Sequence, residues 1–158
     1  MSSMTMGTVD SAKTGVPGSY GQQLVTFVVD GQNFGISALK VRDVLRRQPL
    51  TRVPLAPPEI AGAINLRGHI VTAIDMRSRL GTAPRGRDET TMCVVVEGPD
   101  EWFCLIVDAV GDVITIADSA IEPTPASVPD EWATMMRGVH RMPNCLLLLL
   151  DIEQLLSL

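Results

Sequence analysis

The chain has 158 residues, 46% of them hydrophobic, and a formal net charge of −5 at pH 7. This hydrophobic content predicts a folded protein, and the length suits one domain or two small ones. The acidic balance excludes nucleic acid and anionic membranes as principal partners, because no basic surplus is present to neutralise phosphate groups.

The N-terminal segment differs in composition from the rest of the chain. Residues 1–21 are rich in Ser, Thr and Gly and have no periodic apolar pattern, which predicts a flexible tail before a folded region at 22–158. No segment reaches the roughly 18 to 20 apolar residues of a membrane span, and no secretion signal is recognisable. We therefore expect a cytoplasmic protein that does not insert into a membrane.

Short strands separated by turns begin after this tail. Residues 24–29 and 33–36 predict a hairpin around an Asp-Gly-Gln turn. Ser37 is a candidate helix N-cap, and four of the apolar residues of 38–45 fall on one helical face, so about two turns of helix are expected there; the four are Ala38, Val41, Val44 and Leu45. A further strand is expected at 50–53, before a proline-rich turn.

The centre of the chain combines a hairpin with a short capped helix. Ile64 and Leu66 alternate with small or polar residues, and a turn at Arg67-Gly68 leads to a second strand at 70–74. Asp75 is placed to cap a short helix that Gly81 ends.

The second half repeats the pattern of short strands and turns. We expect strands at 91–96, 102–107 and 112–116, and a last hairpin at 135–140 and 144–150. The loop at 82–89 carries Arg85 and Arg87, and the sequence assigns it no role. Asp151 with Gln154 suggests a capping box for a final short helix.

These segments amount to about ten short strands with brief helices. Helices long enough for parallel crossovers are absent from the pattern, so we expect an all-β fold of antiparallel barrels or a sandwich. Leu146 to Leu150 are five consecutive leucines. Because alternate residues of a strand point to opposite faces, this strand should be buried on both, as it would be between two small barrels.

The residues typical of catalytic or metal sites do not form a recognisable pattern. The three cysteines, Cys93, Cys104 and Cys145, have neither disulfide nor zinc spacing, and we expect buried free thiols. His69 and His140 are expected at strand ends, and the glycines build no phosphate loop. The aspartates at element ends are explained as caps and turns. We therefore expect no enzyme, no metal and no cofactor.

Binding residues are easier to nominate. An arginine at a hairpin tip projects outward, and the planar guanidinium of Arg67 suits a carboxylate of a partner. Alternatively, Arg67 is solvated or pairs internally with Glu59 or Asp75. Met135, Met136 and Trp132 form either an adaptable binding surface or ordinary core, and core packing is the favoured interpretation.

The Asn-Leu-Arg-Gly sequence at Asn65 to Gly68, followed by the capped helix, resembles the CheW family of bacterial chemotaxis adaptors. Further segments resemble that family in the same order, namely residues 23–27, 34–36, 39–44, 51–54, 60–62, 105–113 and 149–156. The resemblance covers roughly residues 22–158. It implies a CheW-like fold, in which two five-stranded SH3-like barrels share an apolar seam and short helices are added.

The resemblance also implies a function. A protein of this family would be a non-enzymatic scaffold that couples the cytoplasmic signalling tips of chemoreceptors to the regulatory domain of a CheA-type histidine kinase, with further CheW copies in rings at membrane-associated arrays. The positions that match its partner-binding surfaces are Val41, Asp43, Val44, Gly62, Asn65, Arg67 and Gly68. Two alternatives remain at this point. One is an adaptor of a twitching, developmental or second-messenger pathway, and the other is a small-ligand-binding barrel, for which the sequence offers no obvious set of pocket residues.

Overall fold

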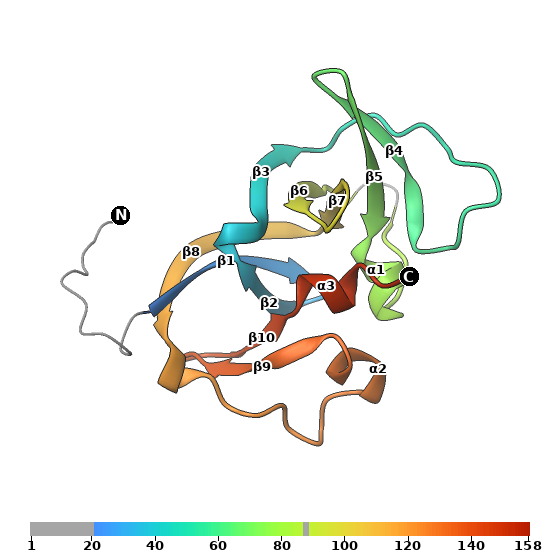
Figure 1. Cartoon of the computed structure of the whole chain (residues 1–158). Helices are drawn as coiled ribbons and strands as arrows, with labels where there is room; N and C mark the ends of the chain where they lie inside the picture. Colours follow the sequence, from blue (N-terminus) through green and yellow to red (C-terminus); the bar gives the residue numbers. More distant parts are fainter. Residues whose placement is uncertain (1–20, 87–88) are drawn as a thin grey trace.

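The computed structural model describes residues 21–86 and 89–158, which fold into two five-stranded sheets (Figure 1). The first sheet has the order β8-β1-β2-β10-β9 and contains β1 (Gly21–Val29), β2 (Gln32–Ser37), β8 (Ala109–Ala117), β9 (Met136–Arg141) and β10 (Leu146–Leu150). The second has the order β3-β6-β7-β5-β4 and contains β3 (Val41–Arg46), β4 (Ile60–Leu66), β5 (His69–Asp75), β6 (Met92–Glu97) and β7 (Trp102–Val107).

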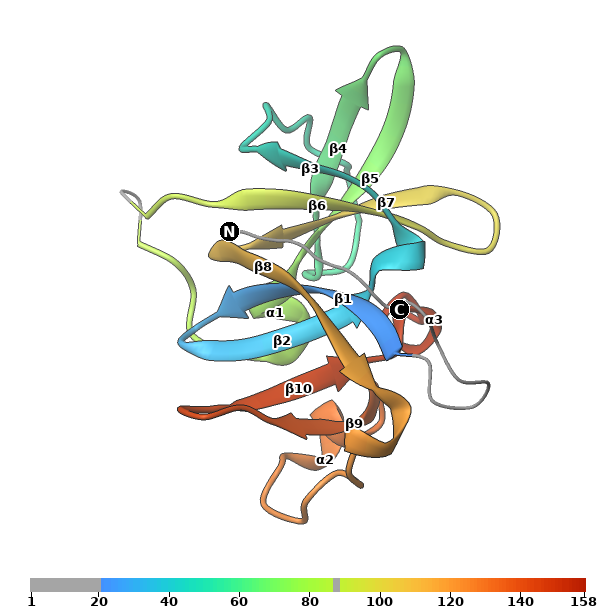
Figure 2. The same ribbon diagram turned by 90° about the vertical axis from the view of Figure 1, so that its left-hand side faces the viewer.

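The helices are short, and all but the last lie between strands. They are η2 (Ala38–Lys40), α1 (Met76–Leu80), η3 (Asp118–Ala120), α2 (Asp130–Ala133) and α3 (Ile152–Leu155). Figure 2 shows the second sheet above the first, with β8 crossing in front of β1. The predicted tail lies outside the described residues except for Gly21, which is the first residue of β1. The ten strands confirm the predicted all-β class.

Each sheet is drawn into a barrel by a pair of backbone hydrogen bonds between its two ends. Thr51, which follows β3, bridges to Ala63 of β4 through two N–H···O bonds of 2.8 Å. Glu122, which follows β8, bridges to Val139 of β9 through bonds of 2.8 and 2.9 Å. We call the first sheet and its closing segment barrel 1, and the second barrel 2.

In both barrels, a glycine at the closing bridge allows the two ends of the sheet to approach. Gly62 and Gly138 immediately precede the bridging residues and have φ values of +154° and +147°. A Cβ at Gly62 would lie 2.6 Å from the Thr51 carbonyl oxygen, and a Cβ at Gly138 would lie 2.5 Å from that of Glu122. Glycine is required because it tolerates positive φ and lets the closing segment approach closely.

The core has three parts, and the leucine-rich strand β10 joins two of them. One cluster fills the seam between the barrels and contains residues of both sheets, including Phe27 and Ile74. Leu148 and Leu150 face this seam, whereas Leu147 and Leu149 face the interior of barrel 1. The prediction of a strand buried on both faces is confirmed, and each buried leucine contributes about 1.5–3 kcal/mol.

Several local predictions are confirmed. The Asp75 side chain accepts from the Arg77 N–H at the start of α1, and Gly81 ends the helix with φ 70°. The Asp151 side chain caps α3 by accepting from the Glu153 N–H, but the predicted capping box with Gln154 is not formed, because the Asp151 N–H donates to the Met135 carbonyl. Met135 is buried in the seam, and Trp132 packs there with its indole N–H donating to the Leu80 carbonyl, so core packing is the correct interpretation of these side chains.

Other expectations were wrong. The helix predicted at 38–45 is limited to η2, because residues 41–46 alternate between half-buried and exposed and pair with β6 as strand β3. The strand predicted at 50–53 is reduced to the single bridge at Thr51, in a segment bounded by prolines that cannot donate to a ladder.

Two further predictions were wrong, namely that all strand pairs are antiparallel and that all three cysteines are buried. Two strand pairs, β10 with β2 and β5 with β7, are parallel. The connection required by the first pair contains all of barrel 2 rather than a crossover helix. Cys93 and Cys104 are buried free thiols as expected, but Cys145 is exposed because it lies in the turn before β10.

Candidate functional site

The tip of the β4–β5 hairpin holds Arg67 in an exposed and defined position. Arg67 and Gly68 have φ values of 51° and 88°, the positive values of a two-residue type I′ turn. The Asn65 side-chain oxygen accepts from the Gly68 N–H at 3.0 Å and braces this turn. The Arg67 side chain is 87% exposed, so its guanidinium projects into solvent as predicted.

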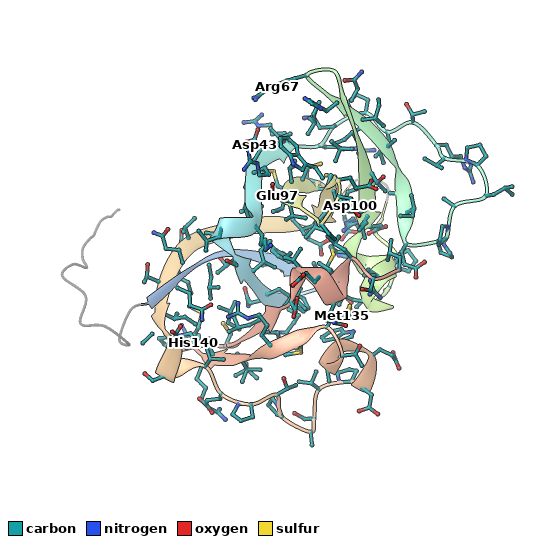
Figure 3. All side chains as sticks on the ribbon, in the orientation of Figure 1. Asp43, Arg67, Glu97, Asp100, Met135 and His140 are labelled. Carbon is teal, nitrogen blue, oxygen red and sulfur yellow. The ribbon has the colours of Figure 1, made fainter. Side chains whose placement is uncertain are left out.

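Arg67 faces an acidic residue that neither internal alternative named. Its Nη2 lies 3.7 Å from Oδ2 of Asp43 on β3, and Figure 3 shows the two residues at the same corner of the molecule. Asp75 pairs instead with Arg85 at 2.8 Å. Since both partners of the Arg67–Asp43 pair are exposed, the pair contributes about 0–1 kcal/mol and leaves the guanidinium available to a stronger acceptor.

A pocket of about 530 Å³ opens at the mouth of barrel 2, between β3 and the β4–β5 hairpin. We call it the hairpin pocket, and its lining residues are Arg42, Asp43, Leu45, Gln48, Asn65, Leu66, Arg67, His69, Val95 and Trp102. The sequence offered no obvious residues for a polar pocket because these side chains come from separate strands. Three predicted site residues, Asp43, Asn65 and Arg67, are brought together here.

Apart from Gly68 of the hairpin tip, the other predicted site residues lie away from this pocket. Gly62 supports barrel closure, and Val41 is half-buried against the seam. Val44, on the β3 face away from the pocket residue Leu45, is 37% exposed. A partner-binding role stays a prediction for all seven positions, including those at the pocket and the hairpin tip.

Three exposed apolar residues belong to elements at the junction between the barrels. Leu39 of η2 is 90% exposed and Val113 of β8 is 59% exposed. Together with Val44 of β3, they belong to elements on the side of the molecule that faces the viewer in Figure 2. We call Leu39, Val44 and Val113 the junction surface. The sequence analysis missed Leu39 and Val113, although Leu39 already fell outside the apolar face of the helix expected there.

A second exposed apolar segment is the connection from β3 to β4. Leu50, Val53 and Leu55 are exposed in this proline-rich connection, and we call them the loop surface. Leu55 is fully exposed and has a φ of 63°, which is strained for leucine. A fully solvated leucine in a strained conformation is typical of a contact site rather than of core packing.

A partly buried ion-pair network joins the two barrels on the opposite side of the junction. Arg77 of α1 donates to Asp108, with a shortest distance of 2.7 Å, and Arg85 donates to Asp108 and to Asp75 at 2.8 Å each. The backbone N–H of Asp30, in the β1–β2 turn, donates to Asp108 at 2.7 Å. Because Asp108 lies between β7 and β8, the network fixes barrel 2 against barrel 1.

The electrostatics of Asp108 follow from these contacts. Partial burial raises its pKa, but hydrogen bonds from Arg77, the Asp30 N–H and Arg85 outweigh that effect and hold the pKa below its usual value. The hydrogen bond to Asp108 likewise raises the pKa of Arg77. The sequence analysis treated the aspartates as caps and turns and assigned Arg85 no role, because the network is assembled from distant segments. Arg87 lies outside the described residues.

Within residues 21–86 and 89–158, no group of three or more His, Cys, Asp or Glu side chains is arranged to hold a metal ion. In the same part of the chain, no helix has the length and apolar character needed to cross a membrane. The notable features of the site are therefore an exposed arginine, a pocket beside it and two exposed apolar surfaces.

Comparison with known proteins gives a consistent result. A family model described as the CheW-like domain matches residues 23–158. A chemotaxis protein CheW of Bacillus subtilis is 32% identical over 87% of this chain and 88% of its own length, and a probable chemotaxis protein CheW of Rhizobium etli is 31% identical over 86% and 88%. The crystal structure of the scaffolding protein TtCheW from Thermoanaerobacter tengcongensis superposes with a TM-score of 0.79 at 29% identity, covering 87% of this chain and 94% of that one.

Proposed function

Because the chain belongs to the CheW-like domain family, we propose that it is a chemotaxis scaffold that couples the cytoplasmic tips of chemoreceptors to a CheA-type histidine kinase. It acts without chemistry of its own, by raising the effective concentration of receptor and kinase and by fixing their geometry. The observation that carries this proposal is Arg67, which is exposed on a braced hairpin tip within the motif that resembles the family's.

The junction surface suits a helical partner. Leu39, Val44 and Val113 are exposed apolar side chains on η2, β3 and β8. An amphipathic helix buries its apolar face against such a surface, with contacts repeating every three or four residues. We assign this surface to the helices of the receptor tip.

The loop surface suits a protein domain with an apolar patch of its own. Leu50, Val53 and Leu55 are exposed in one connection of barrel 2, away from η2 and β8 of the junction surface. Two separate surfaces are needed because a coupling protein holds both partners at once. We assign the loop surface to the regulatory domain of the kinase, with Arg67 contributing a charged contact nearby.

Weak contacts at each surface are sufficient for the proposed role. In an array, each adaptor is held by several neighbours, so that the total binding strength greatly exceeds that of any single contact. Further copies of the adaptor would occupy positions in the rings, and the protein would be recruited to membrane-associated receptor arrays through the receptors.

The test is a purified-component assay with the kinase regulatory domain and a receptor signalling fragment from the same genome. Saturable binding to the kinase, strengthened by the receptor fragment, is expected. Arg67→Glu should lower receptor-stimulated kinase activity about tenfold or more, because a like charge facing an acidic partner costs several kcal/mol. Arg141→Glu is the matched control, since Arg141 is also exposed, lies at the end of β9 in barrel 1 and likewise pairs with a surface carboxylate, that of Glu122.

The outcomes separate the parts of the proposal. Full receptor stimulation with Arg67→Glu would remove Arg67 from the interface while leaving the adaptor function intact. Binding to neither chemotaxis partner would contradict the coupling function and would favour an adaptor of another signalling pathway.

A further inference from the structure

The hairpin pocket has features that a protein–protein contact does not require. It is a concave space of about 530 Å³ at the mouth of a barrel, within the range of about 300–1,000 Å³ that is typical of small-molecule sites. We propose that it binds a small aromatic anion, a flat ring that carries a carboxylate or phosphate group. The pocket shares Arg67 with the proposed kinase contact, but ligand binding is tested on the isolated chain, so that its failure and the failure of the adaptor proposal are distinguishable.

The inner part of the pocket suits a flat ring. Leu45, Leu66 and Val95 supply aliphatic walls, and Trp102 supplies a half-buried aromatic one. The imidazole of His69 lies 5.8 Å from the Trp102 ring, between centroids, with an interplanar angle of 30°. Aliphatic and aromatic groups of this kind favour planar apolar ligands, which retain their contacts without losing conformational freedom.

Arg42 is positioned to receive the charged end of the ligand. Its guanidinium carbon lies 5.0 Å from the centroid of the Trp102 ring, a cation–π distance. Stacking on an aromatic face orients the guanidinium and leaves its N–H groups free at the edges, where they suit the two oxygens of a carboxylate or phosphate.

The local charge favours an anion. Arg42 and Arg67 line the pocket, and Asp43 is the one carboxylate among the described lining residues, so the pocket is positive in a chain of net charge −5. The Arg67–Asp43 distance of 3.7 Å between exposed groups indicates a weak pair. A ligand anion can therefore displace Asp43 from Arg67 at little cost.

Two amides at the rim have groups available for the ligand. The Asn65 oxygen is occupied by the Gly68 N–H, which leaves its NH₂ group as a donor. The Gln48 NH₂ group donates to the Arg46 carbonyl at 2.8 Å, which leaves its oxygen as an acceptor. A ring with polar edge atoms can therefore be oriented as well as held.

The experiment is an NMR titration of the ¹⁵N-labelled full chain with two probes, indole-3-acetate for the carboxylate and guanosine monophosphate for the phosphate. The Trp102 indole N–H signal, identified by its loss in Trp102→Phe, should shift saturably with a Kd of about 1 mM or below for at least one probe. The indole N–H of Trp132, which donates to the Leu80 carbonyl, is an internal control and should not shift.

Matched analogues and variants make the result decisive. The neutral analogues, indole-3-acetamide and guanosine, should bind about tenfold more weakly than the charged probes. Arg42→Gln should weaken binding about tenfold, and Arg46→Gln, on the same strand but outside the pocket, should leave it unchanged. A response to one probe alone identifies carboxylate or phosphate as the ligand group.

Three results would overturn the inference. The first is no saturable shift of Trp102 with either probe up to about 10 mM. The second is equal affinity for charged and neutral analogues, and the third is an equal loss with Arg42→Gln and Arg46→Gln. None of these results affects the adaptor proposal, which is tested with kinase and receptor fragments.

Discussion

Barrel closure depends on Gly62 and Gly138, and alanine at either position should destabilise the protein strongly. A Cβ at Gly62 would lie 2.6 Å from the Thr51 carbonyl oxygen, and the backbone has a φ of +154°. Strain of this kind costs about 1–3 kcal/mol, and each of the two closing hydrogen bonds is worth about 0.5–1.5 kcal/mol. Gly62→Ala should therefore lower the free energy of unfolding by about 2–6 kcal/mol, and Gly138→Ala by a similar amount.

Gly31→Ala is the matched control, because Gly31 also has a positive φ but a Cβ there would not clash with neighbouring atoms. Its φ is +77°, and a Cβ there would meet nothing within 4 Å. Gly31→Ala should cost about 1–2 kcal/mol, from backbone strain alone. Urea unfolding followed by circular dichroism gives the free energies, and for a chain of this length the closure variants should melt about 5–20 °C below the wild type. If Gly62→Ala and Gly138→Ala lose no more than Gly31→Ala, the closure argument is refuted.

The other predictions concern the Asp108 network and the cysteines. The lowered pKa of Asp108 means that its ionised form stabilises the fold above the unfolded-state pKa of about 4, and that this stability is lost as the pH falls through the lower folded-state pKa. Acid titrations of unfolding free energy should therefore be flatter for Asp108→Asn than for the wild type, and parallel curves would contradict the assignment. In thiol labelling, exposed Cys145 should react rapidly and buried Cys93 and Cys104 after unfolding, whereas three fast thiols in the native protein would contradict the described core.

The sequence predicted those features that depend on neighbouring residues. The cap at Asp75, the glycine end at Gly81 and the turn at Arg67 depend on interactions within a few residues, and each was found. The buried leucine strand was also predictable, because five leucines leave no polar face. Barrel pairing is implied by the family resemblance, and the two closing bridges are consistent with it.

Most of the wrong or missing predictions involve distant segments. Residues 38–45 have the apolar spacing of a helix, yet most of them form a strand because they pair with β6. The neighbouring residues in the sequence do not indicate this pairing. Asp43 faces Arg67 because β3 and the β4–β5 hairpin border one pocket, although 24 positions separate the residues in sequence. The ion-pair network around Asp108 combines residues of the β1–β2 turn, of α1 and of the loop after α1.

The chain passes between the barrels twice, and the two crossings connect the network with the junction surface. The first crossing runs from β2 to β3 through η2, which carries Leu39, and the second runs from β7 to β8 through Asp108. The junction surface contains residues from η2, β3 and β8, so its shape depends on how the barrels are held against each other. Asp108 and its arginines therefore position the surface that we assign to the receptor without touching it. Asp108→Asn should weaken receptor-fragment binding through this geometry while leaving the loop surface, which lies within barrel 2, unchanged.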